Sequence, residues 1–148
     1  INPATIADIP RLKSMISNSE LFEPDEISFM ENMIADHFAQ SAPAEQWLLS
    51  EHTAAYLAPE AMSDGAWNVL FIATVSEARS HGHGARMMKA IEDRLRASGA
   101  RLLIVETSGT ARFERTRAFY ARLNYQQSGR ISGYFGPDDD KVIFAKML

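Results

Sequence analysis

Apolar residues along the first third of the chain recur at the spacing of helices and then at that of strands. The runs 7–16 and 24–38 place apolar side chains three and four residues apart, which predicts two amphipathic helices. Pro24 favours a helix start, because a proline at the first helical position gives up no hydrogen bond. The short apolar runs 46–50 and 54–57 predict two strands that follow these helices.

The rest of the chain alternates strands and helices. The apolar run 67–75 is continuous, which is typical of a central strand buried on both faces. Gly99 and Asn124 readily take the left-handed conformation that often follows a helix, so each marks a helix end. The other expected elements are a loop at 76–84, a helix ending before Gly99, a strand at 102–105 closed by Glu106, a helix at 111–123, and strands at 125–131 and 141–148 joined by a turn at 136–140.

This order of elements indicates an α/β or α+β fold whose sheet has parallel strands at its middle. The chain has 148 residues and shows no internal repeat and no low-complexity linker. A chain of that length typically forms one domain, so we expect residues 1–148 to be a single domain. Because the sequence begins at Ile1 rather than at a methionine, we also expect a few residues to precede it in the native chain.

Composition excludes several kinds of site and partner. The chain has no cysteine, which rules out disulfides, a thiol nucleophile and a thiolate zinc site. Its formal net charge is -4 and it has no basic stripe, so a nucleic-acid partner has little electrostatic support. It has no apolar run near the ~18 residues of a membrane span, and no signal-peptide pattern at its start. We therefore expect a cytoplasmic protein that binds neither nucleic acid nor membrane.

The loop after the run 67–75 is the most informative segment, because it leads directly into a helix. Backbone N–H groups at a helix N-terminus lack helical partners and attract anions, and glycine lets a phosphate approach the backbone closely. The segment is therefore a candidate pyrophosphate cradle. It matches neither the dinucleotide fingerprint, whose third glycine position is Met87, nor the P-loop, because Ala85 and Arg86 follow Gly84. A surface loop that merely contains two glycines is the alternative.

This segment resembles the coenzyme A motif of the GNAT acetyltransferase superfamily. Arg79, Gly82 and Gly84 match the family's Arg/Gln-x-x-Gly-x-Gly/Ala pattern after a buried strand. Ser80 stands where many relatives have glycine, and His81 where many have arginine or lysine, so the loop is less basic than usual. Four further segments resemble the family, and they extend the resemblance from Trp47 onward and, more loosely, to the two N-terminal helices: 72–74, 105–108, 119–125 and 139–143.

The resemblance implies a GNAT-type acyl-CoA acyltransferase fold: a mixed, twisted sheet that splays open between its fourth and fifth strands, flanked by about four helices. It also implies that acetyl-CoA binds in that opening as a cosubstrate, without a metal. The resemblance implies that the backbone of Ile72, Ala73 and Thr74 contacts the pantetheine arm. It implies that the pyrophosphate is bound beside Arg79 by the backbone of Ser80, His81, Gly82, His83, Gly84 and Ala85. Thr116 would contact the cofactor in place of an asparagine that many relatives carry.

Acetyl transfer from a thioester to an amine needs a deprotonated amine, a donor for the oxyanion and a proton for the departing thiolate. Tyr120 is the candidate proton donor, because it matches the position of the family's tyrosine acid. The alternative is a core tyrosine packed beside Phe119. Glu106 is the candidate that accepts the amine proton, directly or through water, and its alternative is a strand-end carboxylate bonded to nearby backbone. We expect the oxyanion donor among the backbone N–H groups of residues 73–75.

Several other polar and aromatic residues have less specific interpretations. His81 and His83 form a His-x-His pair, but the remaining histidines lack useful spacing, so we expect no metal site. The aspartates 138–140 are expected in a solvated turn, with attraction of a cationic amine as the alternative. Four aromatic residues are expected in the aromatic core, with a place in an acceptor pocket as the alternative: Trp67, Phe71, Tyr134 and Phe135.

The connection between the two early strands is short and carries no turn signal. Residues 51–53 alone separate them, so we expect either a tight hairpin or, in closer agreement with the sequence, residues missing at this point.

These features together indicate an N-acetyltransferase that moves an acetyl group from acetyl-CoA to a primary amine of a small molecule or a peptide by direct attack. A non-catalytic acyl-CoA-binding module is the main alternative. An acetyltransferase acting on charged tRNA is a further one, which the acidic balance disfavours. Fold does not determine the acceptor. A homodimer is common in the family, although nothing in the sequence indicates one.

Overall fold

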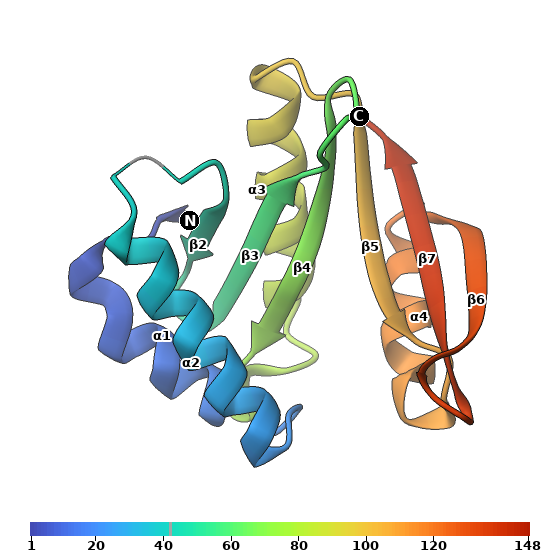
Figure 1. The fold of residues 1–148 in the computed structure, drawn as a ribbon, viewed down its shortest axis with the longest axis horizontal. Helices are drawn as coiled ribbons and strands as arrows, with labels where there is room; N and C mark the ends of the chain where they lie inside the picture. The colour runs from blue at the N-terminus through green and yellow to red at the C-terminus, as the bar shows by residue number, and fades with distance from the viewer. Residues whose placement is uncertain (42) are drawn as a thin grey trace. The chain divides into compact units, whose positions relative to one another are not determined.

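The computed structural model describes residues 1–41 and 43–148, and its strands form a mixed sheet in the order β1-β2-β3-β4-β5-β7-β6 (Figure 1). The strands are β1 (Asn2–Pro3), β2 (Gln46–Leu49), β3 (Thr53–Pro59), β4 (Ala66–Thr74), β5 (Leu102–Ser108), β6 (Gln126–Gly136) and β7 (Asp139–Met147). The α-helices are α1 (Ile9–Ser17), α2 (Pro24–Ala39), α3 (His83–Ala97) and α4 (Glu114–Arg122), and short 3-10 helices lie at Ile6–Asp8, Ser76–Ala78 and Ala111–Phe113. Strands β4 and β5 are parallel, whereas the pairs β1–β2, β2–β3, β5–β7 and β6–β7 are antiparallel, so the expected mixed α/β sheet is confirmed.

The chain forms two compact units. The first comprises Ile1–Ala58 and Phe71–Ile91, and the second comprises Pro59–Leu70 and Glu92–Leu148. Strand β4 and helix α3 therefore each contribute residues to both units. The single domain expected from the length of the chain stays a prediction.

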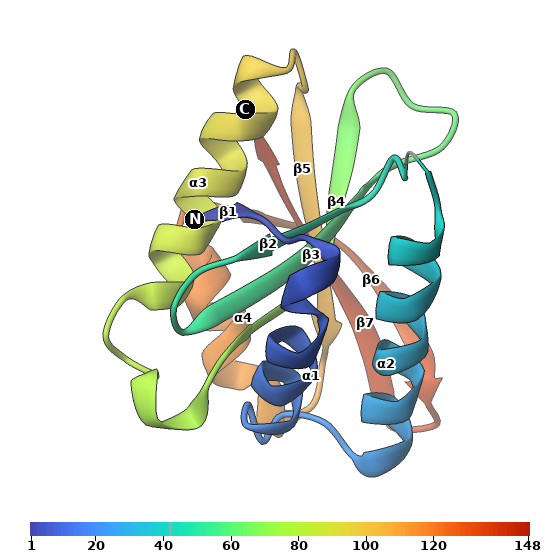
Figure 2. The same cartoon turned by 90° about the vertical axis from the view of Figure 1, so that its left-hand side faces the viewer.

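In the first unit, α1 and α2 lie on one side of β2 and β3, and the start of α3 lies on the other side (Figure 2). Leu12 and Ile16 stand four residues apart on one face of α1, and both are fully buried in a core that includes Ile34 and Trp47. Pro24 occupies the first turn of α2, as the sequence predicts. Burial of these amphipathic faces is what holds the two helices against the strands.

The hairpin between β2 and β3 is tight. Leu49 pairs with Ala54, and the N–H of Ser50 donates to the carbonyl of Thr53 at 2.9 Å. The Ser50 hydroxyl accepts from the N–H of Thr53 at 3.0 Å, and Arg11 donates to the Ser50 carbonyl at 2.7 Å. The structure thus adopts the tight alternative, because the Ser50 side chain and Arg11 supply the hydrogen bonds that a glycine-based turn would otherwise make.

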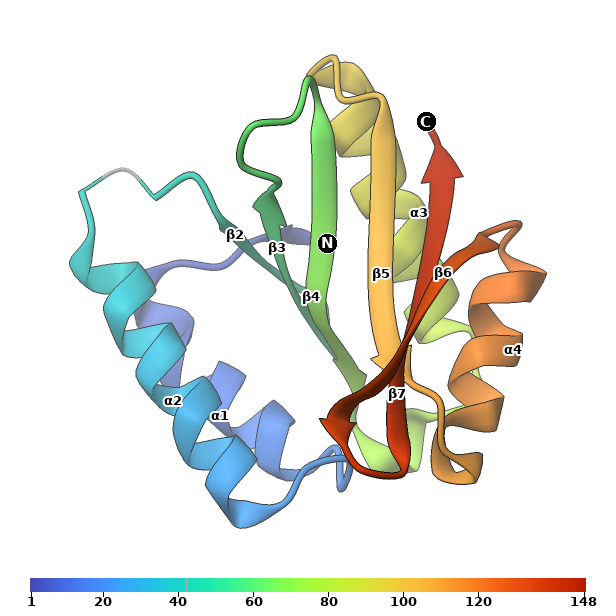
Figure 3. The ribbon, with the colours of Figure 1, turned by 45° about the vertical axis from the view of Figure 1, so that its right-hand side comes forward.

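In the second unit, β5 and β6 both pair with β7 in antiparallel fashion, and α4 lies along one face of β5 and β7 (Figure 3). The parallel pairs between β4 and β5 run from Ala66–Leu102 to Val69–Val105. Gly99 (φ +86°) follows α3 and Asn124 (φ +65°) follows α4. Both helix ends are therefore where the sequence places them.

The two faces of the β5–β7 ribbon differ in burial. Val105 and Phe144 form a pair on the face that α4 covers, and both are buried. Glu106 and Ile143, the next pair along, are only half-buried. Because successive side chains of a strand point to opposite faces, Glu106 lies on the face away from α4.

Two strand predictions were wrong. Strand β5 does not close at Glu106 but continues to Ser108, because β7 goes on pairing with it as far as Lys141. The run 67–75 is not buried on both faces, since the Leu70 side chain is 52% exposed. A continuous apolar run predicts a strand, but only the packed neighbours decide which of its side chains are covered.

Within the described part of the chain, no helix combines the length and the apolar character needed to cross a membrane.

Candidate active site

The loop between β4 and α3 has two residues with positive φ in the segment expected to cradle a phosphate. Ser80 has φ +65° and Gly82 has φ +78°, so both lie in the left-handed region. Helix α3 begins at His83, and the Gly82 carbonyl accepts its first hydrogen bond from the N–H of Arg86 at 3.0 Å. The N–H groups of the first helical residues consequently have no partner within the helix. Such a group of backbone donors fits an anionic ligand.

Most of this loop is open to solvent. Arg79, Ser80, His81 and Gly82 are exposed, and the next three residues, His83, Gly84 and Ala85, are half-buried in the first turn of α3. The left-handed φ of Ser80 explains why glycine would be favoured there, because an L side chain in that conformation is strained. The structure thus brings together all the residues predicted for the pyrophosphate.

Arg86 folds back over the start of α3. Its Nη2 donates to His83 Nδ1 at 2.8 Å and its Nη1 donates to the His81 carbonyl at 3.2 Å. Partial burial, together with the charge of Arg86, lowers the pKa of His83. The lowered pKa favours the neutral form of His83, and the Arg86 guanidinium that donates to it supplies positive charge beside the loop.

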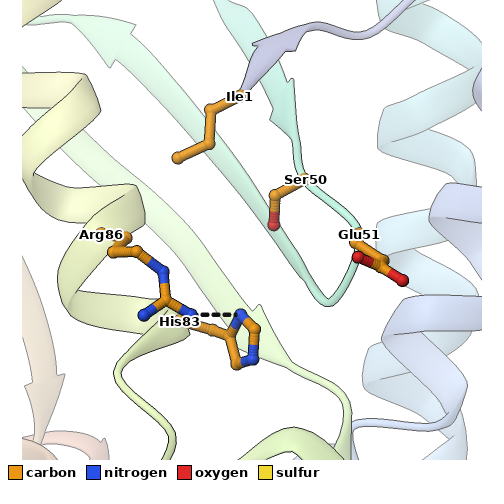
Figure 4. Close-up of a pocket in the computed structure, with 5 residues that line it drawn as sticks. All are labelled: Ile1, Ser50, Glu51, His83 and Arg86. Carbon is orange, nitrogen blue, oxygen red and sulfur yellow. Dashed lines mark hydrogen bonds between the residues drawn. The ribbon is translucent and has the colours of Figure 1, made fainter.

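His52, at the tip of the β2–β3 hairpin, meets this region although sequence spacing gave no hint of it. Its ring lies edge-on to that of His83, with 4.6 Å between the ring centroids. A surface pocket lies here, lined by Ile1, Ser50, Glu51, His83 and Arg86 (Figure 4). In the described residues, no group of three or more His, Asp or Glu side chains is arranged to hold a metal ion.

The end of β4 holds the backbone groups expected to contact the pantetheine arm. The Thr74 hydroxyl lies 2.9 Å from the Thr53 hydroxyl, and the N–H of Val75 donates to the His52 carbonyl at 3.0 Å. Val75 is therefore not available as an oxyanion donor, which corrects part of the range expected from the sequence. Because N–H groups alternate in direction along a strand, those of Ile72 and Thr74 point away from β3, whereas that of Ala73 points toward it.

Tyr120 of α4 is buried in the second unit, with its side chain among other aromatic rings. Its ring centroid lies 5.2 Å from that of Phe119, 5.8 Å from that of Tyr125 and 5.9 Å from that of Phe144. Burial raises the pKa of the Tyr120 hydroxyl well above its usual value. Tyr120 therefore carries its proton at any physiological pH, as a proton donor must. The packing beside Phe119 equally matches the core-tyrosine alternative.

Glu106 is held by an ion pair that the sequence did not suggest. Lys141 Nζ lies 2.6 Å from Glu106 Oε2, and Lys141 is itself buried. The carboxylate thus bonds to a side chain of β7 rather than to nearby backbone. Since Tyr120 packs on Phe144 and Glu106 lies on the face away from α4, the two candidate catalytic residues are on opposite faces of the β5–β7 ribbon.

Thr116 lies in the first turn of α4 and is half-buried. The neighbouring Arg117 donates to the carbonyls of Ser108 and Thr110 at 2.7 and 2.8 Å. These bonds tie the start of α4 to the end of β5, and they determine where Thr116 and Tyr120 stand within the second unit.

The β6–β7 hairpin differs from expectation in two ways. Tyr134 and Phe135 are half exposed rather than part of the aromatic core, because they lie near the hairpin tip, beyond the covered part of the sheet. Asp139 and Asp140 are not solvated turn residues, because both begin β7 and bond inward. Asp139 accepts from the Ser108 hydroxyl at 2.6 Å, and Asp140 pairs with Arg130 at 2.5 Å.

The sequence profile described as the Acetyltransferase (GNAT) family matches residues 16–125. The chain belongs to the GNAT acetyltransferase family. GNAT proteins are acetyl-CoA-dependent N-acetyltransferases, and they acetylate amines. No curated protein sequence matches the chain.

Solved GNAT structures share the fold over nearly the whole chain. A protein assigned to the GNAT family from Desulfovibrio desulfuricans superposes with a TM-score of 0.90 at 20% identity, covering 99% of this chain and 96% of that one. The ribosomal-protein-S18-alanine N-acetyltransferase of Escherichia coli gives a TM-score of 0.77 at 15% identity, with 99% and 92% covered. An aminoglycoside 6'-N-acetyltransferase complexed with coenzyme A gives 0.69 at 16% identity, with 99% and 97% covered. The expected GNAT fold is thereby confirmed.

Proposed function

We propose that this chain is an active N-acetyltransferase that moves an acetyl group from acetyl-CoA to a primary amine by direct attack. The observation that carries the proposal is the exposed loop with two left-handed residues that leads into the first turn of α3, whose N–H groups have no partner within the helix. Because the GNAT family uses acetyl-CoA, we take the pyrophosphate of acetyl-CoA as the anion that this loop binds. Tyr120 and Glu106, which could supply the proton transfers, favour an enzyme over a binding module.

In this proposal the loop between β4 and α3 binds the cosubstrate. The backbone from Ser80 to Ala85 holds the pyrophosphate, with Arg79 and Arg86 adding positive charge beside it. The N–H groups of Ile72 and Thr74, which point away from β3, bind the pantetheine arm and polarise the acetyl carbonyl. Acetyl-CoA itself supplies an acetyl group activated as a thioester.

Tyr120 and Glu106 carry the proton transfers in this proposal. Tyr120 donates its proton to the departing thiolate, and its raised pKa ensures that the proton is present beforehand. Glu106 accepts a proton from the amine. The two residues lie on opposite faces of the β5–β7 ribbon, whereas the amine nitrogen and the thiolate sulfur are bonded to the same carbon in the tetrahedral intermediate. The proposal therefore has Glu106 accept the amine proton through water rather than directly.

The acceptor is a primary amine of a small molecule or a peptide. The E. coli relative is named for an alanine of a ribosomal protein and another relative for an aminoglycoside, and at this level of identity neither acceptor transfers to this chain.

Thiol release from acetyl-CoA tests the proposal cleanly, because the chain has no cysteine and a thiol reagent reports coenzyme A alone. The assay is run with tyramine, spermidine, kanamycin and an alanine-initiated peptide as acceptors, and acetyl-CoA binding is measured in parallel by calorimetry. We expect binding, turnover with one of these amine classes, and a fall of about 10²–10⁴-fold in kcat for Tyr120→Phe.

Tyr125→Phe is the control, because Tyr125 is also buried and lies in the same aromatic cluster; since its hydroxyl donates to Glu92 Oε1 at 3.0 Å, the folding of this variant is checked by urea unfolding. It removes a hydroxyl without touching the proposed acid, so kcat should stay near that of the unmodified chain. Binding of acetyl-CoA without turnover for any amine would favour the acyl-CoA-binding module instead. Absence of binding by the folded protein would refute both readings.

A further inference from the structure

Arg86 makes three contacts with the loop that leads into its own helix, although its side chain is exposed. Its backbone N–H donates to the Gly82 carbonyl at 3.0 Å, and its Nη1 donates to the carbonyl of the preceding residue, His81, at 3.2 Å. Its Nη2 donates to His83 Nδ1 at 2.8 Å (Figure 4). One arginine therefore holds two successive carbonyls of the loop and the imidazole that follows them.

These two carbonyls determine where the next two N–H groups point. None of the described peptide bonds is cis. In a planar trans peptide the C=O and the N–H point in opposite directions. Since the carbonyls of His81 and Gly82 face Arg86, the N–H groups of Gly82 and His83, which lie in the same two peptide planes, face away from it. These N–H groups are two of the donors proposed for the pyrophosphate, and the carbonyl oxygens that would repel an anion lie on the other side.

The bond to Gly82 belongs to the helix, but the bond to His81 depends on the guanidinium. His81 precedes the first residue of α3 and stands between two residues with positive φ, Ser80 and Gly82. Gly82 also lets the guanidinium come close, because a Cβ at that position would stand 3.3 Å from Arg86 Nη1. The orientation of the His81–Gly82 peptide thus depends on one side chain.

His52 supports this arrangement from the tip of the β2–β3 hairpin. Its ring lies edge-on to that of His83, and its carbonyl accepts from the N–H of Val75, which directly follows β4, at 3.0 Å. The His83 ring consequently has Arg86 on its Nδ1 and His52 against its face or edge. An acceptor Nδ1 exists only in the neutral ring, which is the form that the lowered pKa of His83 favours. The guanidinium therefore meets an acceptor that is itself held in place.

We propose that Arg86 is a positioning residue for the acetyl-CoA loop: it fixes the His81–Gly82 peptide so that the Gly82 N–H faces the pyrophosphate. The inference rests on the proposed function, because it deepens the role of the same loop. The planar guanidinium offers several donors in a fixed geometry and reaches a carbonyl and an imidazole at once, whereas a lysine ammonium is a point charge. Arg86→Lys therefore keeps the charge beside the loop and loses the double contact.

The order of this peptide can be measured without any ligand. NMR relaxation gives the order parameter of the Gly82 amide in the unmodified chain, in Arg86→Lys and in Arg86→Met. Order parameters of about 0.85 mark a rigid backbone and values below ~0.6 a flexible one. We expect a rigid Gly82 amide in the unmodified chain and a fall toward the flexible range in both variants.

Arg96→Lys is the matched control for the NMR measurement. Arg96 is another exposed arginine of α3, and it likewise bonds to a side chain three residues before it, that of Asp93, at 3.2 Å. Because this contact lies near the other end of the helix, its loss should leave the order parameter of the Gly82 amide unchanged.

Binding of acetyl-CoA separates positioning from charge. If Arg86 acts through its charge alone, Arg86→Lys should bind acetyl-CoA as tightly as the unmodified chain. Positioning predicts a dissociation constant about 10-fold higher, at the lower end of the cost of one lost hydrogen bond to a charged group. Arg79→Gln, which removes a charge beside the same loop, should weaken binding and leave the Gly82 amide rigid. In turnover, Arg86→Lys should raise KM for acetyl-CoA with little change in kcat, because ground state and transition state lose the same contact.

Either of two results would overturn the inference: an unchanged order parameter of Gly82 in both Arg86 variants, or tight acetyl-CoA binding by Arg86→Lys. If the Arg86 variants unfold, His52→Ala takes their place, because it loosens the His83 ring from outside the loop. It should lower the same order parameter by a smaller amount, and an unchanged value would also overturn the inference. If the unmodified chain does not bind acetyl-CoA, the proposed function fails, and the order parameters still decide whether Arg86 fixes the peptide.

Discussion

Gly82 is the residue at which the cofactor loop can be tested most directly. Its φ is +78°, a conformation that costs an L residue about 1–2 kcal/mol. A methyl group added there would stand 3.3 Å from Arg86 Nη1, which is the end of a flexible side chain and can move aside. Gly82→Ala should therefore lower the free energy of unfolding by about 1–2 kcal/mol, nearly all of it from the backbone.

The same substitution should weaken acetyl-CoA binding beyond its effect on stability. If the strained loop loses one backbone N–H contact with a phosphate, the loss is about 1.5–3 kcal/mol, because hydrogen bonds to charged groups are worth that much. The dissociation constant would then rise by roughly 10- to 150-fold. Urea unfolding measures the first effect and calorimetric titration of acetyl-CoA the second.

Gly99→Ala provides the control for this pair of measurements. Gly99 has φ +86°, and a methyl group there would meet nothing within 4 Å, so the backbone cost is similar while the cofactor loop is untouched. The phosphate cradle at Gly82 would be supported if both variants lose the same free energy of unfolding and only Gly82→Ala binds acetyl-CoA more weakly. The reasoning is refuted if Gly82→Ala binds acetyl-CoA as tightly as Gly99→Ala does.

Three further outcomes are expected. Ser80→Gly should raise the free energy of unfolding by up to about 1 kcal/mol, because glycine relieves the left-handed strain, and a loss of stability in urea would contradict that. Lys146→Met breaks the pair with Glu92 and should lower the free energy of unfolding by about 2–3 kcal/mol, which is less than for a fully buried pair because the Lys146 side chain is 23% exposed. Lys13→Met breaks the exposed pair with Glu31 and should lower the free energy of unfolding, measured in urea, by less than ~1 kcal/mol. The pKa of Tyr120 is raised in the folded state, so above pH ~10 only the unfolded chain loses this proton. The free energy of unfolding should therefore fall by up to about 1.4 kcal/mol for each pH unit above ~10. Urea unfolding at several alkaline pH values should show that the free energy of unfolding falls less steeply with pH for Tyr120→Phe than for the unmodified chain. Equal slopes would contradict a raised pKa of Tyr120.

Sequence patterns predicted the local elements of the fold well, for reasons that act over a few residues. Pro24 starts α2, and the left-handed Gly99 and Asn124 follow α3 and α4. Each of these preferences belongs to the backbone of the residue itself. The cofactor loop is of the same kind, because its glycines and its place before a helix can be read along the chain.

Contacts between distant segments could not be read in this way. The tight β2–β3 hairpin depends on Arg11 reaching Ser50, and the approach of His52 to His83 depends on that hairpin. Neither contact leaves a periodic or compositional signal. The exposure of Tyr134 was also not predicted, because an aromatic side chain in a strand does not by itself indicate whether a helix or another strand covers it.

The sequence by itself determined the class of fold, the order of its elements and the loop proposed to bind the cofactor, since these follow from hydrophobic period, turn chemistry and a local motif. Only the tertiary structure decided that Glu106 is paired with Lys141 and that Tyr120 and Glu106 lie on opposite faces of the β5–β7 ribbon. Register between strands sets both facts, and register arises from the packing of the whole sheet rather than from any one segment.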